Sequence, residues 1–443
     1  MPTPSTPLPA HPTGTPGPLP AARLGRLARI AVPLVLALVA TACAGGAAGG
    51  AGTTDAGSEP AAGGDEACTR VEEVDGGSAS VPVASPHPNP VGFFPWEGSD
   101  DEPVVALEGF DTEEVLPGGP PPDGILPVDD PCVESVAVAD TWLEDAESVM
   151  VVEVEGDARA YPLRIMTQHE IVNDVVGGEP LVVTYCPLCN SGLAFSRVVD
   201  GEAWDFGTSG RLYRSNLVMY DRQTRTLWSQ FAGEAVWGQP EVVGTTLDRV
   251  ATSLVAWSEF RAAFPDGLVL ARESVPGRDY GRNPYPGHEG NGSGFLFRGP
   301  TDERLDPDSR VLGVGAEVDP AAVPWDRLVE ERVVELEVDG EPLVAFWAPG
   351  QASALDADTV AAGEDVGQTA VFERTLDGRV LTFSPAPDAS ARVVDAETGT
   401  TWDLFGRAVD GELVGARLAE VPRDDTFWFV WFAFQPDTRI EVR

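Results

Sequence analysis

Lysine is absent from this 443-residue sequence, so the 29 basic residues are all arginines, and they are outnumbered by 71 acidic residues. The formal net charge is −42 at pH 7. A surface of this charge repels nucleic acid and anionic lipid, which excludes nucleic acid as a partner. The acidic residues are spread along the chain instead of forming one run. This spread favours adaptation to high salt over an acidic surface that binds cations.

Familiar catalytic motifs are also missing. No phosphate-binding glycine loop, no Ser-His-Asp set and no carboxylate pair of defined spacing stands out. Hydrolase and nucleotide-binding functions therefore find no support in the sequence. The chain has only four histidines and five cysteines, so few residues are left to carry chemistry.

Long apolar runs are scarce, and the most prominent one lies near the start of the chain. Residues 30–42, IAVPLVLALVATA, follow three arginines and are too short to span a bilayer as a stable helix. They end in ATAC, which resembles a bacterial lipobox and would make Cys43 the lipid-bearing first residue of the mature protein. An ordinary secretory signal with a chance cysteine is the alternative. We expect a protein attached through Cys43 to the extracytoplasmic face of the cell membrane, with an unknown protein partner.

Composition divides the chain further. A Gly/Ala-rich segment after Cys43 predicts a flexible leash, and a Gly- and Pro-rich stretch near residue 290 predicts a long ordered loop. The expected parts are a lipoprotein signal peptide, a leash, an irregular N-terminal extension, a first lobe, an inter-lobe loop and a second lobe, at residues 1–42, 43–66, 67–145, 146–270, 271–310 and 311–443.

The two expected lobes resemble each other in sequence. GGEPLVVTYCP at 177–187 matches DGEPLVAFWAP at 339–349, and WSEFRAAFPDG at 257–267 matches WFVWFAFQPDT at 428–438. The repeat is too long for a solenoid and predicts two homologous lobes produced by an internal duplication.

Short alternating apolar runs separated by Gly, Asp and Asn turns predict the fold class. We expect a β-rich α+β fold with mainly antiparallel strands. The few short helices are expected near residues 163–173, 253–264 and 427–434.

The segment VTYCPLCNSG, residues 183–192, holds the best candidate site. Cys186 and Cys189 stand where the second copy has Ala348 and Gln351, so the fold does not require them. A Cys-Pro-x-Cys turn can present two sulfurs together, as a metal knuckle does. His169 has no counterpart in the second copy either. A turn and a strand separate it from Cys186, so the chain could bring it back beside the two cysteines. Two thiolates and an imidazole suit a soft metal, and the sequence predicts copper or zinc.

Two alternatives to a metal site remain open. In a thiol–disulfide oxidoreductase, Cys186 would be the attacking thiolate, Cys189 the resolving thiol and His169 the base. The helix that follows such a motif in thioredoxin-like proteins is missing here, because NSG after Cys189 predicts a turn. In a non-catalytic surface binding module, the same pair would be a structural disulfide or two inert thiols.

Two further sets of residues are candidates. Cys68 and Cys132 lie in loop-like sequence of an exported chain, which favours a disulfide between them. The segment DFGTSGRLYRSN, 205–216, could form an anion-binding rim from Ser209, Arg214 and Asn216. A plain hairpin is the alternative for this segment.

At these residues the sequence resembles the bacterial and archaeal family called domain of unknown function 3179, over roughly residues 118–440. The resemblance implies an exported, often lipid-anchored protein and brings no established activity. Asn190 departs from the family pattern, in which Gly commonly follows the second Cys, but Asn tolerates a left-handed turn. Thr167 and Gln168 also depart from it, because an aromatic residue is frequent before the histidine. The positions that match the characteristic family motifs are His169, Glu170, Asn173, Asp174, Cys186, Pro187 and Cys189, and then Gly207, Ser209, Gly210, Asn216, Asp221, Trp228 and Gln230.

Overall fold

The computed structural model describes residues 103–129, 131–290, 294–316, 318–387 and 391–442, together with Thr69, Arg70 and Phe94. The chain divides into two compact units, Met1–Gly64 and Asp65–Arg443, and every described residue belongs to the second. The predicted signal peptide, the leash, Cys43 and Cys68 lie outside the described residues and stay predictions. Across the described part of the chain, no helix has the length and apolar character needed to cross a membrane.

Strands dominate the described residues, and most of their pairings are antiparallel. The α-helices are short, which confirms the predicted β-rich class with few helices. The five helices of the described residues are α2 (Val136–Ala139), α3 (Leu163–His169), α4 (Trp257–Ala263), α5 (Trp325–Glu331) and α6 (Trp428–Phe434).

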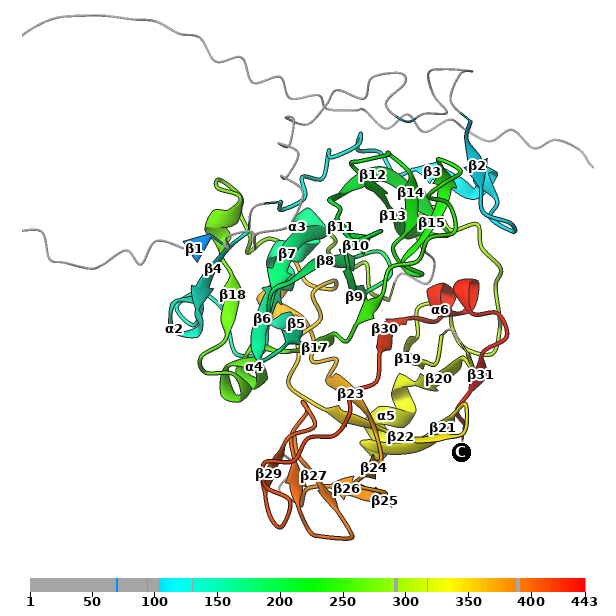
Figure 1. The fold of residues 1–443 in the computed structure, drawn as a ribbon. Helices are drawn as coiled ribbons and strands as arrows, with labels where there is room; N and C mark the ends of the chain where they lie inside the picture. The colour runs from blue at the N-terminus through cyan, green and yellow to red at the C-terminus, as the bar shows by residue number, and fades with distance from the viewer. Residues whose placement is uncertain are drawn as a thin grey trace, which may run out of the picture. The chain divides into compact units, whose positions relative to one another are not determined.

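The first half of the fold contains three larger sheets and the two-stranded sheet β10–β11 (Val198–Val199, Glu202–Ala203) (Figure 1). One is six-stranded in the order β1-β4-β18-β6-β5-β17, with β18 parallel to β6 and the other neighbours antiparallel. Its strands are β1 (Thr69–Arg70), β4 (Cys132–Ser135), β5 (Ser148–Val154), β6 (Asp157–Pro162), β17 (Ser253–Ala256) and β18 (Leu268–Leu270).

The second sheet, β16-β9-β8-β7, is a meander with one added edge strand, and the third, β2-β15-β14-β13-β12-β3, continues from it along the chain. The second sheet comprises β7 (Ile171–Val176), β8 (Glu179–Cys186), β9 (Ser191–Ser196) and β16 (Arg249–Val250). The third comprises β2 (Val105–Ala106), β3 (Val115–Pro117), β12 (Phe206–Tyr213), β13 (Asn216–Asp221), β14 (Leu227–Ser229) and β15 (Glu234–Gly238).

The second half, yellow to red in Figure 1, has sheets in the orders β30-β19-β20-β31, β21-β22-β23 and β26-β27-β28-β29. The first comprises β19 (Arg310–Val314), β20 (Ala321–Pro324), β30 (Arg423–Phe427) and β31 (Arg439–Ile440). The others comprise β21 (Val333–Val338), β22 (Glu341–Ala348), β23 (Gln368–Glu373), β26 (Phe383–Pro385), β27 (Val393–Asp395), β28 (Thr401–Trp402) and β29 (Ala408–Asp410).

The two halves use the same order of elements and the same pairing directions. In the first, β17 and β6 flank β5 antiparallel and β18 lies parallel to β6. In the second, β30 and β20 flank β19 antiparallel and β31 lies parallel to β20. A helix follows the second strand of each sheet, α3 after β6 and α5 after β20.

The helices are shorter than the sequence suggested. The expected helix at 163–173 ends at His169, because Glu170 adopts a positive φ of 61° and the β-branched run after it forms β7. Residues 253–256 are likewise a strand, and α4 begins only at Trp257. These helices of about two turns gain their stability from buried apolar side chains, such as Leu163 in α3, and not from their own length.

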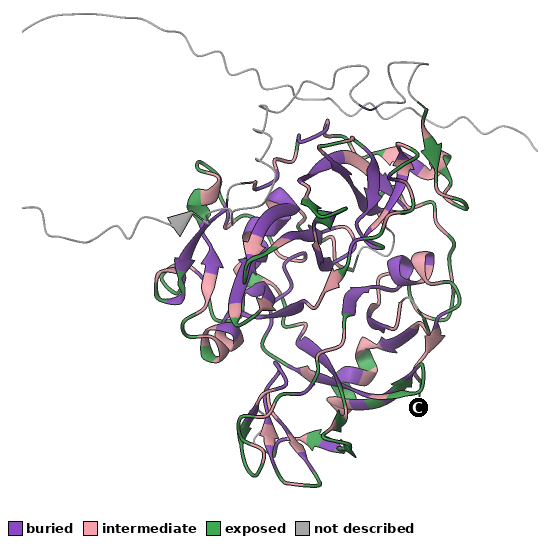
Figure 2. Ribbon diagram, in the orientation of Figure 1, coloured by how far each residue is buried: buried purple, intermediate pink, exposed green. Residues whose placement is uncertain are grey.

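The core of the second unit is continuous between its halves. One cluster of buried residues contains Cys186, Cys189 and Trp228 from the first half together with Phe427 and Trp431 from the second. Figure 2 shows buried residues along the strands of both halves, whereas the hairpin β24–β25 (Thr375–Leu376, Arg379–Val380) is largely exposed. The cysteine pair therefore lies where the halves pack together.

Candidate functional site

The cysteine pair lies on the turn between β8 and β9. Cys186 is the last residue of β8 and is paired with Ser191, the first residue of β9. The N–H of Cys189 donates to the carbonyl oxygen of Cys186 at 3.1 Å, which closes the turn. Asn190 has a φ of 52°, which confirms that asparagine takes a left-handed conformation here.

The two thiols are free and touch each other. Their Sγ atoms are 3.2 Å apart, and the exposed fractions are 2% for Cys186 and 0% for Cys189. The N–H of Leu217 donates to Cys186 Sγ, and Nδ2 of Asn216 donates to Cys189 Sγ, each at 3.4 Å. The Ser215 carbonyl oxygen lies 3.4 Å from Cys189 Sγ. Burial raises the pKa of the Cys189 thiol well above its usual range, and neighbouring Cys186 adds to the rise.

Residues of the second half fix the turn from outside. The hydroxyl of Thr426 donates to the carbonyl oxygen of Cys189 at 2.8 Å, and Asn190 Nδ2 donates to the carbonyl oxygen of Asp425 at 3.2 Å. Both bonds join residues more than 230 positions apart in sequence. The conformation of the turn therefore depends on β30.

Amides of the first half complete the support. Asn216 Nδ2 also donates to Gln230 Oε1 at 2.7 Å, and Gln230 Nε2 donates to Thr184 Oγ1 at 3.0 Å. All three side chains are buried. Buried amides without hydrogen-bond partners are costly in free energy. This series of hydrogen bonds therefore fixes β13 against the end of β8.

Glu170 is a carboxyl whose negative charge acts on the Cys189 thiol. It is buried at the end of α3, and its charge contributes to the raised pKa of Cys189. The hydroxyl of Tyr285 donates to Oε1 of Glu170 at 3.3 Å. Burial raises the pKa of Glu170 to about 7, and the bond from Tyr285 offsets part of that rise. Glu170 can therefore exchange a proton near neutral pH.

His169 occupies a different place from the one expected of a ligand or base. Its Nδ1 donates to the carbonyl oxygen of Leu126 at 2.5 Å, and its Nε2 lies 2.9 Å from the hydroxyl of Tyr280. Burial lowers the pKa of His169, so the ring is neutral. Neither ring nitrogen is directed at the sulfurs. The structure brings Cys186 and Cys189 together and gives His169 a structural role.

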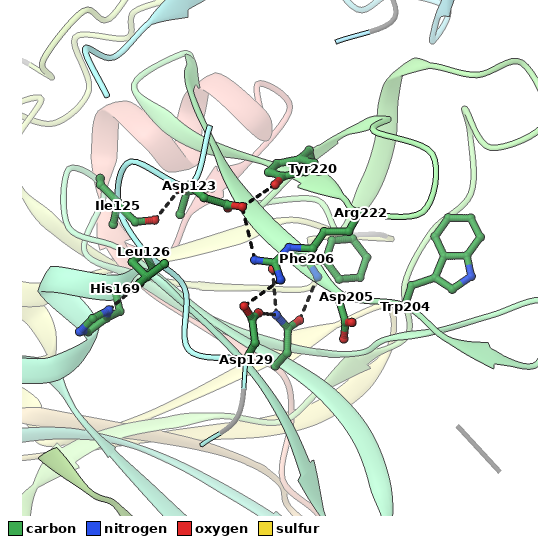
Figure 3. A network of polar contacts seen from close by, with 12 residues as sticks. Asp123, Ile125, Leu126, Asp129, His169, Trp204, Asp205, Phe206, Tyr220 and Arg222 are labelled. Atoms are coloured by element: carbon green, nitrogen blue, oxygen red, sulfur yellow. Dashed lines mark hydrogen bonds and ion pairs between the residues drawn. The ribbon is translucent and has the colours of Figure 1, made fainter. Parts of the chain in front are cut away.

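The segment that His169 contacts is also fixed by a buried polar network (Figure 3). Arg222 lies between two carboxylates of that segment, 2.7 Å from Asp129 Oδ2 and 3.5 Å from Asp123 Oδ2. The hydroxyl of Tyr220 donates to Asp123 at 2.6 Å, and Asn173 Nδ2 donates to Asp129 at 2.7 Å. Burial raises the pKa of Asp123, and Arg222 opposes the rise. We call residues 118–129 the proline-rich segment, and these buried contacts hold it in place beside the site.

A pocket of about 420 Å³ lies beside the cysteine turn. Leu188, between the two cysteines in sequence, forms part of its wall, as do Leu217 and Glu170. Nε2 of His288 donates to the carbonyl oxygen of Leu188 at 3.0 Å, so this histidine braces the turn instead of facing the sulfurs.

The predicted anion-binding rim is not assembled as one group. Arg214 pairs with Glu114, its Nε 3.0 Å from Oε2, and also donates to the carbonyl oxygen of Ala433. Ser209 donates to the carbonyl oxygen of Val218 on the neighbouring strand. Only Asn216 belongs to the candidate site, where it contacts sulfur.

Cys132 is disulfide-bonded. Its expected partner, Cys68, lies outside the described residues, so the pairing itself stays a prediction. Among the described residues, no group of three or more His, Cys, Asp or Glu side chains is arranged to hold a metal ion.

Other residues that match the family motifs build the frame. Asp174 accepts hydrogen bonds from Arg159 and Tyr161, and Trp228 Nε1 donates to Asp221 at 2.9 Å. All of these side chains are buried. Their contacts fix β6, β7 and the β13–β14 turn.

Two residues of the site were given no chemical role from the sequence. Glu170 directly follows His169 and matches a family motif, and Tyr285 lies in the inter-lobe loop. A further signal for Glu170 is its place directly before the apolar strand Ile171–Val176, which is a costly position for a charge. Nothing local to Tyr285 indicates its contact with a residue 115 positions away.

The family comparison covers most of this fold. The model of the family described as "Protein of unknown function (DUF3179)" matches residues 122–438. No curated protein and no solved structure matches the chain. The match spans both halves, the cysteine turn and the inter-lobe loop.

Proposed function

The chain belongs to the DUF3179 family, and we propose that it is a thiol oxidoreductase in which Cys186 and Cys189 cycle between a dithiol and a disulfide. The observation that carries the proposal is the 3.2 Å separation of two free Sγ atoms on one tight turn. A disulfide bond is about 2.05 Å long, so closing it requires a displacement of only about 1 Å.

The surroundings of the sulfurs support distinct roles. Cys186 is the more exposed of the two, and the N–H of Leu217 stabilises a thiolate at its Sγ. Cys189 is fully buried with a raised pKa, which suits a resolving thiol that stays protonated until it is needed. Glu170 replaces His169 as the proton acceptor in this proposal, because both ring nitrogens of His169 have other partners.

Binding of a soft metal is the second candidate function. Two adjacent thiolates without a third side-chain ligand suit two-coordinate Cu(I) better than zinc, which is usually held by three or four protein ligands. The same two residues would act as ligands, so the two functions exclude each other only while metal is bound.

One experiment separates these functions. The full chain is purified anaerobically in detergent without chelators, and metal content and free thiols are measured on the same sample. It is then equilibrated in thiol–disulfide buffers of graded potential and trapped with an alkylating reagent. We expect a reversible loss of two thiols per chain, absent in Cys186→Ser and in Cys189→Ser and retained in Ser191→Ala.

The other outcomes are equally informative. Near-stoichiometric copper that disappears in Cys186→Ser would favour the metal-binding function. A Cys186–Cys189 disulfide that no buffer reduces would make the pair a structural staple, as in a non-catalytic binding module, and would contradict the redox proposal.

We also infer that the protein is a lipoprotein of the extracytoplasmic membrane face, attached through Cys43. The lipobox-like ATAC sequence and the disulfide-bonded state of Cys132 support this location, because disulfides persist in oxidising compartments. Substitution Cys43→Ser should abolish labelling by a radioactive fatty acid and shift the protein from the membrane to the soluble fraction. Unchanged labelling in the variant would contradict the inference.

We further infer that the two halves descend from one duplicated unit, of which the second lost its cysteines. The shared order and directions of strands support this inference. Equivalent local contacts support it too, since Trp228 Nε1 donates to Asp221 and Trp402 Nε1 to Asp395, both at 2.9 Å. An experimental structure in which the halves differ in strand order or direction would contradict it.

A further inference from the structure

The pocket beside the dithiol is built from five segments of the chain. They are the proline-rich segment near Ile125, the end of α3 at Glu170, the cysteine turn, the β12–β13 pair and the inter-lobe loop near Tyr285. The first of these is fixed from behind by His169 and by the network of Figure 3. The volume of the pocket, about 420 Å³, falls within the usual range for small-molecule sites.

The chemical character of the pocket limits what it can bind. Most of its wall is apolar, including Pro120, Ile125, Leu188 and Phe295. Its polar groups include Glu170, which shares a hydrogen bond with Tyr285. With a net charge of −42, the chain repels anions and so disfavours anionic low-molecular-weight thiols. A neutral, largely apolar molecule with a hydrogen-bonding oxygen at one end fits this lining.

The pocket is separated from the sulfurs by a thin wall. Leu188 stands between the two cysteines in sequence and is only half-buried. Leu217 lines the pocket with its side chain, and its N–H donates to Cys186 Sγ. A ligand ring that displaces the Leu188 side chain would therefore meet Cys186 first and the fully buried Cys189 second.

We propose that this pocket binds a quinone, which accepts the electrons of the Cys186–Cys189 dithiol. The inference rests on the redox function proposed above and adds the class of electron acceptor. The ring lies against the apolar wall, and Glu170 hydrogen-bonds one of the quinone oxygens.

The proposed reaction balances within these groups. The Cys186 thiolate adds to a ring carbon and forms a C–S bond. Cys189 sulfur then attacks Cys186 Sγ, so that the S–S bond forms and the C–S bond breaks, and its electron pair returns to the ring. The dithiol loses two electrons and two protons, and the quinone gains both as a hydroquinone. Glu170 accepts and passes on a proton during these steps.

The test uses the reduced full chain and a water-soluble 1,4-naphthoquinone without an isoprenoid tail. Thiol loss and hydroquinone formation are followed together under anaerobic conditions. Ile125→Trp narrows the pocket at a residue of its lining, and Leu126→Trp places the same side chain one residue away, outside the pocket lining. A hydrophilic small disulfide serves as a second oxidant in every sample.

We expect one hydroquinone for every two thiols lost. The rate with the quinone should fall at least tenfold in Ile125→Trp and stay within twofold in Leu126→Trp, while oxidation by the small disulfide stays unchanged in both. Equal quinone rates in Ile125→Trp and the wild type would overturn the assignment of the pocket. Oxidation by the small disulfide but never by the quinone would overturn the acceptor class and leave the redox function standing. A pair that resists both oxidants would overturn both proposals.

Discussion

The hydroxyl of Tyr285 donates to Oε1 of Glu170 across 3.3 Å, joining the inter-lobe loop to the end of helix α3 inside an apolar site. Burial, which raises the pKa of Glu170, outweighs this hydrogen bond, which lowers it. This pair therefore gives the site a carboxyl that changes charge near pH 7, and it leads to the first prediction.

Glu170→Gln should change how stability depends on pH. The pKa of Glu170 is raised from 4.5 to about 7 in the folded protein, so the folded state binds more protons than the unfolded state between these values. The free energy of unfolding of the wild type should therefore fall as pH rises from about 4.5 to about 7, by at most about 3 kcal/mol from this group.

The Gln variant keeps the shape of the side chain and cannot titrate, so that component of the fall should be missing from its profile. Urea unfolding of both proteins at several pH values from 4.5 to 8 measures the difference. Parallel profiles for the two proteins would contradict the assigned pKa.

Thr426→Val should loosen the cysteine turn without unfolding the protein. The substitution removes the hydroxyl that donates to the carbonyl oxygen of Cys189 but keeps the side-chain volume. We expect a loss of about 1 to 2 kcal/mol in stability and a faster reaction of the dithiol with an alkylating reagent. Thr426→Ser retains the hydroxyl and is the matched control. Identical alkylation rates in Val, Ser and wild-type proteins would show that the bond does not govern access to the sulfurs.

Gly210→Ala should be much more harmful than Gly201→Ala. Both glycines have positive φ, 70° and 83°, so an alanine is strained in either place. A Cβ at Gly210 would lie 2.0 Å from the carbonyl oxygen of Pro120, whereas nothing lies within 4 Å of a Cβ at Gly201. We expect a cost of about 1 kcal/mol at Gly201 and several times that at Gly210, measured by chemical denaturation. Similar losses of stability in the two variants would mean that the proline-rich segment moves away from an added Cβ at little cost in free energy.

Asp221→Asn and Asp395→Asn should respond to pH in opposite directions. Burial raises the pKa of Asp221, whereas hydrogen bonds from Trp402 and Thr398 outweigh burial and lower that of Asp395. The stability that the Asp395 carboxylate contributes is present above its unfolded pKa and is lost as pH falls. For Asp221 the wild type gains stability on acidification.

The deficit of Asp395→Asn relative to the wild type should therefore grow with rising pH, and that of Asp221→Asn should shrink. Parallel unfolding curves at pH 3, 5 and 7 for the two variants and the wild type provide the test. Slopes of the same sign would contradict the different titration of the two equivalent carboxylates.

Local sequence signals predicted the strands and the position of the cysteine turn well. The β-branched residues of β7 and β8 favoured strands at these positions. Asn190, directly after the second cysteine, adopts the left-handed conformation that the turn needs. The turn is local in sequence, so its geometry could be inferred from the spacing of Cys186 and Cys189.

The partners of the turn could not be inferred in the same way. His169 and Glu170 are adjacent, but the positive φ at Glu170 separates their directions, so one contacts the proline-rich segment and the other faces the pocket. Arg214 likewise meets Glu114, 100 residues away, which removes the free positive charge that an anion site would need. Contacts at such sequence distances leave no mark in the local pattern.

The bond between Thr426 and Cys189 links residues 237 positions apart, and it has a consequence for the order in which the molecule becomes active. In the export that we propose from the lipobox-like sequence, a chain threaded through the membrane from its N-terminus would present both cysteines long before β30 emerges. Until then the turn lacks its final support, and the thiols remain open to the chemistry of their surroundings. Under that proposal the cysteine turn would gain its last support only when export ends, and a chain cut short before β30 would carry the cysteines without the bond from Thr426.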